Sequence, residues 1–518
     1  MPDIAGFNPR LPCVAESPAV RPDQENDIIP ANSGPRSGHR CLCDYDGIKN
    51  LKRAFSCFVD TSPILRAQAF IWVNCLKHIQ HIPPTAMYVH MPAESSEFSD
   101  WLRDEGVKIV ESDLFDPRNR YCNKLQQLST FVKEEFQQVV LMDCDTAWVG
   151  NQRIPNGNPV SAKIVDLANP AESVVKSIFH EAGLGDPEWA PVSFPAGEDR
   201  ACTDWNNCNG GLYIIDGDFL PTLAPKWKSW ARWCLDHEDL FGAQKQHADQ
   251  ISFALAMAEL QTRVRHLDVS WNYPAHLKNK HRLPDLAPNI IHYHREFTSH
   301  MTLKKTGLGT VDETIEALNT AIKGFMRERL VNSMFWDFRY RTDPDLGSGV
   351  GSRGDSLAYK RNLLADQLDG LPDTEVVDVG CGDLEVTRNL QLSHYIGLDV
   401  SEAALGIARE KRPDWEFRHI RQCGDIPTAD YLICLDVLIH QPDERSFLEL
   451  IDRLAGATRH CLIVSGYDSP PEFTSQLTRY YEPLSAALHR TDAFTKIDQI
   501  GKYRDTVVLS AVKRAEYT

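Results

Sequence analysis

Two carboxylates lie one residue apart at the end of an apolar run, where VVLMDCDTAWVG places Asp143 and Asp145 after a predicted buried strand. Acids arranged in this way can hold Mn²⁺ or Mg²⁺, and such an ion could neutralise a diphosphate leaving group. The spacing alone is weak evidence, because the chain contains four such pairs. The others lie in loop-like sequence or where they can cap a helix; they are Asp44/Asp46, Asp216/Asp218 and Asp343/Asp345.

A Gly-rich turn is the second candidate for chemistry. In VVDVGCGDLE an apolar predicted strand leads to Gly380 and Gly382, where a bulky side chain would keep a cofactor away from the backbone. About twenty residues later, the predicted strand in YIGLDVS ends in Asp399. An acid at this position can accept hydrogen bonds from ribose hydroxyls. Further on, Asp425 can face an adenine, and Asp436 ends the apolar strand ADYLICLD.

Both groups of residues need a sheet to hold them. Short apolar runs alternate with longer amphipathic segments twice, from Ala54 and again from Thr374, which predicts α/β architecture with mostly parallel sheets. Between the two blocks lies a predicted helical region, followed by a Gly- and Ser-rich stretch. We therefore predict a disordered tail over residues 1–45, a first domain over 46–304, a helical linker over 305–327 and a second domain over 328–518.

The composition excludes several classes of protein. With 42% hydrophobic and 25% charged residues, the chain is typical of a soluble globular protein. The formal net charge of -17 argues against broad electrostatic binding to nucleic acid. No run is long enough to cross a bilayer, the N-terminal residues do not resemble a signal peptide, and fourteen cysteines without a CxxC pair fit a reducing compartment. We expect a cytoplasmic protein without a transmembrane segment, whose oligomeric state stays open.

The second block resembles class I S-adenosylmethionine-dependent methyltransferases, because the turn and the acids follow one another in that order over about 140 residues. The upstream FWDFRYRTDPDLGSGVGSRGDS resembles a methyltransferase subgroup in which such a segment helps to close over the cofactor. A dinucleotide-binding Rossmann domain is the alternative, but VDVGCGD lacks the third glycine of GxGxxG. The resemblance implies a seven-stranded sheet and a site for S-adenosylmethionine lined by Asp378, Gly380, Gly382, Asp399, Asp425 and Asp436. For Asp378 a plainer alternative is that it supports the turn from the end of the strand.

A histidine follows the last of these acids. His440 lies four residues after Asp436, at the rim where a methyl acceptor should arrive. Its unperturbed pKa near neutrality suits a general base that takes the proton of a hydroxyl acceptor. The alternative is that His440 caps or packs the following helix. Nothing in the sequence resembles the NPPY-type signature of amino-group methyltransferases, which favours oxygen as the methylated atom.

The first block resembles GT-A glycosyltransferases, closest to the glycogenin-like families. The resemblance runs from Ala54 to Phe297 and includes KLQQLSTFVKEEF, the DCD segment, CNGGLYIID, HADQISFALAMAEL, VSWNYP and PNIIHYHREF in order. It implies a metal held by Asp143, Asp145 and His292, donor contacts from Lys124, Asn209, Gly210 and Gly211, and Asp249 with Gln250 near the reacting face. His294 competes with His292 for the metal. Two departures weaken diphosphate recognition: Cys144 replaces the usual small residue, and HYHREF lacks the usual Gly and Lys.

Together the resemblances imply two Rossmann-like domains in a bifunctional enzyme. The first would transfer a sugar from a nucleotide sugar with Mn²⁺ or Mg²⁺, and the second would methylate a glycan or another hydroxyl acceptor. Fusion would keep the product at a high local concentration near the second site. One alternative is a methyltransferase whose first domain only binds carbohydrate or nucleotide, and another is a non-enzymatic scaffold. The sugar, the nucleotide, the acceptor and the retaining or inverting outcome are not determined by the sequence.

Overall fold

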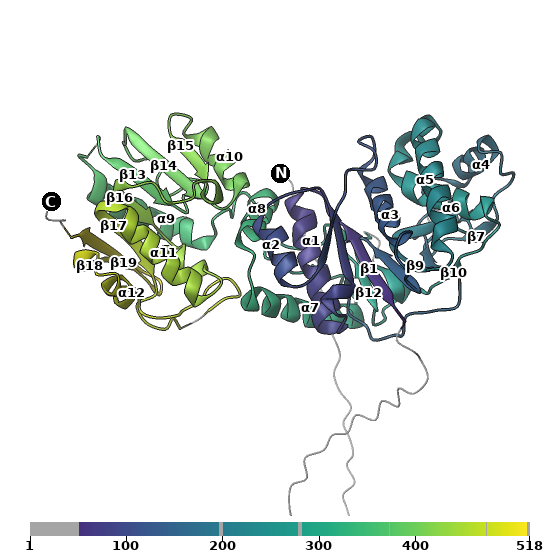
Figure 1. Cartoon of the computed structure of the whole chain (residues 1–518), viewed down its shortest axis with the longest axis horizontal. Helices are drawn as coiled ribbons and strands as arrows, with labels where there is room; N and C mark the ends of the chain where they lie inside the picture. The colour runs from purple at the N-terminus through teal and green to yellow at the C-terminus, as the bar shows by residue number, and fades with distance from the viewer. Residues whose placement is uncertain (1–50, 196–199, 278–281, 372, 473, 515–518) are drawn as a thin grey trace, which may run out of the picture. The chain divides into compact units, whose positions relative to one another are not determined.

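The computed structural model describes residues 51–195, 200–277, 282–371, 373–472 and 474–514 (Figure 1). The predicted tail over residues 1–45 lies outside the described residues. Among the helices that are described, none is both long and apolar enough to cross a membrane.

The first sheet has seven strands in the order β10-β6-β9-β4-β1-β2-β3. The four strands β3, β2, β1 and β4, which are neighbours in this order, run parallel to one another. Strand β9 is antiparallel to both β4 and β6. The strands are β1 (Arg53–Phe58), β2 (Met87–Met91), β3 (Lys108–Glu111), β4 (Gln138–Met142), β6 (Val160–Ile164), β9 (Cys208–Asp216) and β10 (Arg265–His266).

Side chains of this sheet alternate between two cores. Phe55 and Val140 belong to one core cluster and Ala54 and Val139 to the other, as expected when successive strand residues point to opposite faces. Helices α5 and α6 lie side by side and contribute to the second cluster (Figure 1). The helices of this region are α1 (Pro63–Asn74), α2 (Glu97–Asp104), α3 (Gln127–Phe131), α4 (Glu172–Glu181), α5 (Leu220–Asp236) and α6 (Ala248–Glu259).

The predicted linker forms a helix that is part of this first core. Helix α7 (Gly309–Glu328) buries Val311, Ile315, Leu318 and Ile322, which are spaced three or four residues apart and lie on one face. The next helix, α8 (Asn332–Thr342), adds Phe335 and Phe338 to the same cluster.

A small three-stranded sheet positions the end of the first domain. Strand β12 (Ile290–His292) is antiparallel to β5 (Thr146–Trp148) and parallel to β11 (Tyr273–Pro274). The register pairs His292 with Thr146. This pairing brings His292 beside the acids that precede β5, although nearly 150 residues separate them in the sequence.

The second sheet confirms the predicted seven-stranded α/β architecture, in the order β15-β14-β13-β16-β17-β19-β18. The first five strands of this order run parallel, β19 is antiparallel to both of its neighbours, and β18 at the edge runs in the same direction as the first five. The carboxyl ends of β13, β14 and β16 therefore meet at one edge, where α/β sheets bind ligands. The elements are α9 (Gly354–Leu368), β13 (Glu375–Val379), β14 (His394–Asp399), α10 (Glu402–Lys411), β15 (Glu416–His419), β16 (Ala429–Cys434), α11 (Glu444–Ala457), β17 (Thr458–Gly466), α12 (Leu484–Arg490), β18 (Phe494–Tyr503) and β19 (Thr506–Lys513).

His90 makes the first domain sensitive to acid. It has no exposed surface, and its ring nitrogens lie 3.1 Å from Ser56 Oγ and 2.9 Å from Thr130 Oγ1. Burial lowers the pKa of His90 from 6.5 to about 4. The unfolded chain therefore binds a proton that the folded chain excludes, so stability falls as the pH decreases from 6.5 towards 4.

We expect the substitution His90→Gln to remove part of this acid sensitivity. Between pH 7 and pH 4.5, the free energy of unfolding should fall by about 2 kcal/mol more in the wild type than in the variant. Urea unfolding at the two pH values measures the difference, with the exposed His180 changed to Gln as the matched control. An equal loss of stability in all three proteins would contradict the assignment.

Candidate functional site

The acid pair Asp143/Asp145 lies between β4 and β5 and meets His292 from β12. His292 Nε2 is 3.2 Å from Asp145 Oδ1, and both side chains are mostly buried. On the other edge of the ring, Nδ1 of His292 lies 2.9 Å from Asn272 Oδ1, so that a proton on Nδ1 leaves Nε2 free to accept. Burial alone would lower the pKa of His292, but the neighbouring Asp145 carboxylate raises it.

Lys124 connects three residues from different elements. Its Nζ lies 2.7 Å from Asp143 Oδ1 and 3.3 Å from Asp249 Oδ2, and it donates to the carbonyl oxygen of Gly210 at 3.1 Å. These residues come from the 3-10 helix η3 (Arg120–Gln126), the β4–β5 turn, α6 and β9. The structure thus brings four of the residues that the sequence predicted into one cluster. Burial would lower the pKa of Lys124, but the two carboxylates raise it.

The two predicted glycines are explained by close packing in this cluster. A Cβ on Gly210 would lie 2.5 Å from Lys124 Nζ, and one on Gly211 would lie 2.6 Å from His292 Nδ1. Asn209 fixes the same strand, because its Oδ1 accepts from the Gly211 backbone N–H at 3.0 Å. Its Nδ2 donates to Asp166 Oδ2 at 2.9 Å. Any side chain larger than hydrogen at 210 or 211 would displace a predicted site residue.

One predicted residue, Gln250, makes its contact outside the cluster, and one residue close to His294 was not predicted. Gln250 is half-buried, and its side chain hydrogen-bonds with His247 and not with one of the clustered acids. His276 was missed by the sequence analysis, although its ring lies face to face with that of His294, with the centroids 3.7 Å apart. The signal that could have found it is the pairing of Pro274 with His292, which places residues 276 and 294 at equivalent positions beyond the paired strands.

A large cavity occupies the edge of the second sheet. Its volume is about 990 Å³, and its lining includes six of the residues predicted from the sequence. These are Asp378, Gly380, Gly382, Asp399, Asp436 and His440. The predicted residue Asp425 does not line the cavity, and its side chain is exposed. The expectation that Asp425 faces an adenine is therefore not met in this structure, in which Ile420 and Arg421 line the cavity after β15.

Asp399 accepts a hydrogen bond from the backbone of the Gly-rich turn. Gly380 and Gly382 have positive φ values of 80° and 54°, which favour glycine. The backbone N–H of Gly382 donates to Asp399 Oδ2 at 2.9 Å, and that of Ser401 donates to Asp399 Oδ1 at 2.9 Å. Burial raises the pKa of Asp399 to about 6. Each carboxylate oxygen keeps a further lone pair that could accept from a ligand.

Asp378 matches the plainer of its two interpretations. Its Oδ2 accepts from the Tyr395 hydroxyl at 2.6 Å and from Thr387 Oγ1 at 3.3 Å. Burial raises its pKa to about 6. The carboxyl group thus ties β13 to β14 and to the segment after the turn, which supports the turn from behind.

Asp436 also lines the cavity. It has a positive φ of 60°, which is unusual for a residue other than glycine. Its Oδ2 lies 2.5 Å from Nζ of the buried Lys360, and its Oδ1 accepts from Ser465 Oγ at 3.1 Å and from the Tyr503 hydroxyl. Strained residues held by surrounding contacts in this way are frequent at functional sites.

His440 is oriented by a backbone carbonyl rather than by the next helix. Its Nδ1 lies 2.7 Å from the Leu477 carbonyl oxygen and therefore carries the proton, which leaves Nε2 as an acceptor. Burial lowers the pKa of His440. Helix α11 is capped by Asp443, whose side chain accepts from the Ser446 backbone N–H at 2.7 Å, so His440 does not cap it. The ring also packs edge to face against Trp336.

The Gly- and Ser-rich segment contacts the Gly-rich turn. A Cβ on Gly382 would lie 2.6 Å from Ser348 Oγ and 2.7 Å from the Tyr340 hydroxyl. Ser348 Oγ donates to Asp383 Oδ1 at 3.0 Å, and Arg353 forms an ion pair with Asp383 at 2.5 Å. Sequence reasoning had not singled out these side chains, because they approach the turn from a different part of the chain.

Arg339 is a further cavity residue that sequence reasoning missed. It is only 5% exposed, and its Nε is buried without a hydrogen-bond partner. Within the part of the chain that the structure describes, no salt bridge joins it to an acid, and its guanidinium lies near His300, Phe335 and Trp336. By contrast, the cavity cations Lys360 and Arg421 each have a carboxylate partner.

Comparisons with known proteins concern the methyltransferase resemblance. No protein-family model matches the chain. A stretch of 122 residues, 22% of this chain and 49% of the other, is 28% identical to the ubiquinone biosynthesis O-methyltransferase of Alkalilimnicola ehrlichii, so the match spans about half the length of that curated relative.

Two solved structures illustrate the similarity. Magnesium protoporphyrin IX methyltransferase from Synechocystis PCC 6803 aligns over 35% of this chain and 100% of its own, with 22% identity and a TM-score of 0.29. The N-methyltransferase NodS from Bradyrhizobium japonicum WM9 aligns over 30% of this chain and 96% of its own, with 17% identity and a TM-score of 0.26. The seven-stranded sheet order and the sequence similarity to the O-methyltransferase together show that the C-terminal part of the chain has a class I S-adenosylmethionine-dependent methyltransferase fold.

Proposed function

We propose that the C-terminal domain transfers a methyl group from S-adenosylmethionine to a hydroxyl acceptor. The observation that carries this proposal is the cavity of about 990 Å³ that has Gly380, Gly382 and Asp399 in its wall. Both glycines have positive φ values, so this wall has a backbone conformation that favours glycine. When bound, the sulfonium cofactor supplies the electrophilic methyl group.

The chain's own residues have distinct roles in this proposal. Asp399 would accept hydrogen bonds from the ribose hydroxyls, while Asp378 supports the turn and Asp436 forms an ion pair with Lys360 in the cavity lining. His440 would take the acceptor's proton at Nε2, because the Leu477 carbonyl holds the proton of the ring on Nδ1. Its lowered pKa keeps the imidazole neutral and able to act as a base near neutral pH.

Arg339 would bind the carboxylate of the methyl donor. A buried guanidinium without an acidic partner is costly, and an anionic ligand in the cavity would satisfy it. The donor is a zwitterionic amino acid at one end, so it brings the carboxylate that this cation lacks.

We expect Arg339→Met to weaken S-adenosylhomocysteine binding about 10-fold, because one charge-assisted hydrogen-bond pair is lost. Methionine keeps much of the apolar packing of the arginine stem. Titration calorimetry with 5′-methylthioadenosine, which lacks the amino-acid part, is the control and should show no difference between wild type and variant. Equal losses for both ligands would mean that Arg339 supports the cavity structurally, and no loss for either would exclude the carboxylate role.

For the first domain we propose metal-dependent transfer of a sugar from a nucleotide sugar to a glycan or another hydroxyl acceptor. The convergence of Asp143, Asp145, His292, Lys124 and Asp249 supports it. Asp143, Asp145 and His292 would hold Mn²⁺ or Mg²⁺, which when bound neutralises a diphosphate. Lys124 would contact the phosphates, Asn209, Gly210 and Gly211 would adjoin the sugar, and Asp249 with Gln250 would adjoin the reacting face.

Titration calorimetry of the whole protein tests both proposals. S-adenosylhomocysteine should bind, and UDP or GDP should bind only when Mn²⁺ is present. Binding of S-adenosylhomocysteine alone would exclude the glycosyltransferase proposal and favour a methyltransferase whose first domain binds carbohydrate or nothing. Absence of S-adenosylhomocysteine binding would exclude the methyltransferase proposal.

A further inference from the structure

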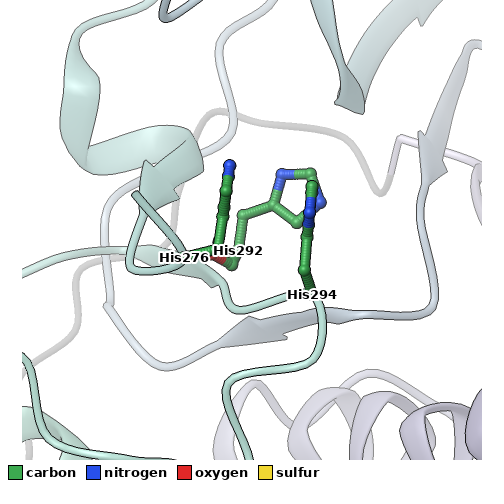
Figure 2. Close-up of side chains that lie close together, drawn as sticks. All are labelled: His276, His292 and His294. Atoms are coloured by element: carbon green, nitrogen blue, oxygen red, sulfur yellow. The ribbon is translucent and has the colours of Figure 1, made fainter. Parts of the chain in front are cut away.

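Three histidines gather at the end of the small sheet in the first domain. His292 comes from β12, His294 follows it, and His276 follows β11 (Figure 2). The rings of His276 and His294 are stacked with centroids 3.7 Å apart and 2° between their planes. His292 lies edge-on to both, at 5.4 Å from His276 and 4.3 Å from His294. One ring nitrogen from each can be chosen so that all lie within 4.8 Å of one another.

The rings of His292 and His276 are each oriented by an oxygen acceptor that contacts Nδ1. Nδ1 of His292 lies 2.9 Å from Asn272 Oδ1, and Nδ1 of His276 lies 3.2 Å from the His292 carbonyl oxygen. A proton on each Nδ1 satisfies these contacts and leaves both Nε2 atoms with free lone pairs. Histidines that bind metals are oriented in this way, through a hydrogen bond from the nitrogen that does not bind the ion.

A buried pair of atoms points to the same place. His292 Nε2 and Asp145 Oδ1 are both buried and face each other at 3.2 Å, and neither atom has another hydrogen-bond partner among the described residues. His292 itself is 2% exposed. With the ring proton on Nδ1, two acceptor atoms face each other here, and either a second ring proton on Nε2 or a cation bound by both atoms satisfies them. Asp143 is different, because Lys124 already forms an ion pair with it at 2.7 Å.

We propose that the divalent ion of the first domain is ligated by His294 and His276 in addition to Asp145 and His292, which makes the site rich in nitrogen. The inference rests on the proposed metal-dependent function and changes the expected ion. Imidazole ligands suit Zn²⁺, Co²⁺, Fe²⁺ or Ni²⁺, whereas Mg²⁺ is bound by oxygen ligands. The site therefore takes a nitrogen-preferring transition metal ion, and Mg²⁺ binds through the carboxylates only.

The distances between the three histidines allow them to bind one ion after small rotations of the rings. Nitrogens that bind one ion at about 2.1 Å each lie roughly 3–3.5 Å apart. The three imidazole nitrogens are already within 4.8 Å of one another, and the rings turn about side-chain bonds. Without a metal ion, the stack of His276 on His294 has a purely structural explanation, because the two residues follow paired positions on two parallel strands. The experiment therefore distinguishes a structural stack from a metal site.

The test is to titrate the whole protein with Co²⁺ and with Mg²⁺, using the variants His276→Phe and His294→Phe. Phenylalanine keeps an aromatic ring in the stack but removes the ligand atoms. We expect each variant to lose about 10-fold or more of the Co²⁺ affinity, with a changed visible absorption spectrum of bound Co²⁺ and an unchanged Mg²⁺ affinity. The near-ultraviolet circular dichroism spectrum, measured without metal, confirms that the variants are folded.

Three other outcomes are distinguishable. If both variants bind Co²⁺ with the wild-type affinity and spectrum, the two histidines are a structural stack and the inference is overturned. If the variants are unaffected while Asp145→Asn abolishes binding of either ion, the metal-dependent proposal stands and only the nitrogen-rich site fails. If the wild-type protein binds neither ion, both fail.

Discussion

Replacement of Asp399 by alanine is expected to weaken S-adenosylhomocysteine binding by about 100-fold or more, since each hydrogen bond to an ionised group contributes about 1.5–3 kcal/mol. Two ribose hydroxyls can donate to this carboxylate. The substitution also removes the acceptor of the Gly382 backbone N–H, so the Gly-rich turn loses part of its support. Titration calorimetry with S-adenosylhomocysteine measures the loss.

The matched control for this prediction is Asp425→Ala. Asp425 is exposed and does not line the cavity, so the affinity of this variant should equal that of the wild type. The pH dependence gives a second readout. Because burial raises the pKa of Asp399 to about 6, lowering the pH from 7.5 to 5.5 should weaken binding to the wild type but not to the alanine variant. A larger effect of Asp425→Ala than of Asp399→Ala would reverse the assignment of the two acids.

In the first domain, the substitution Asp145→Asn is expected to abolish the metal-dependent binding of UDP or GDP. The amide keeps the shape of the side chain but removes the charge that would attract the ion. Asp145 faces His292 at 3.2 Å, so the loss of its charge also removes the partner that raises the pKa of that histidine. Calorimetric titration of the nucleotide with saturating Mn²⁺ should show at least about 100-fold weaker binding, in line with the loss of a charged metal ligand.

The control is Asp218→Asn, in another pair of acids with the same spacing. Asp218 is exposed, and its backbone N–H donates to Asp216 Oδ1 at 3.0 Å as part of a turn. This variant should bind nucleotide and metal like the wild type. Should both variants retain metal-dependent nucleotide binding, the ion is held elsewhere and the proposed metal site is wrong.

The sequence determined the elements whose signal is local. The strand that leads to Gly380, the strand that ends in Asp399 and the acids after β4 were all predicted, because an apolar run and the residues of the turn after it are neighbours in the chain. The α/β architecture, predicted from the same local runs, is confirmed, and so is the seven-stranded second sheet, which the resemblance to class I methyltransferases implied. The sequence analysis did not predict strand β18, because half of its side chains are exposed and its apolar positions show no clear alternation.

Only the tertiary structure decided which residues meet. The sequence contains four acid pairs of equal spacing, and the pairing of β12 with β5 is what places His292 beside Asp143 and Asp145. The same pairing of distant strands assembled His276 with His294, and the packing of α8 brought Arg339 into the cavity.

Asp425 shows the opposite case. Its spacing suited a cofactor contact, but strand β15 ends at His419 and the following turn leaves the side chain exposed. Sequence spacing fixes how far along the chain a residue lies. Its direction in space depends on turns and on hydrogen bonds between residues far apart in the chain, which form only when the sheets assemble.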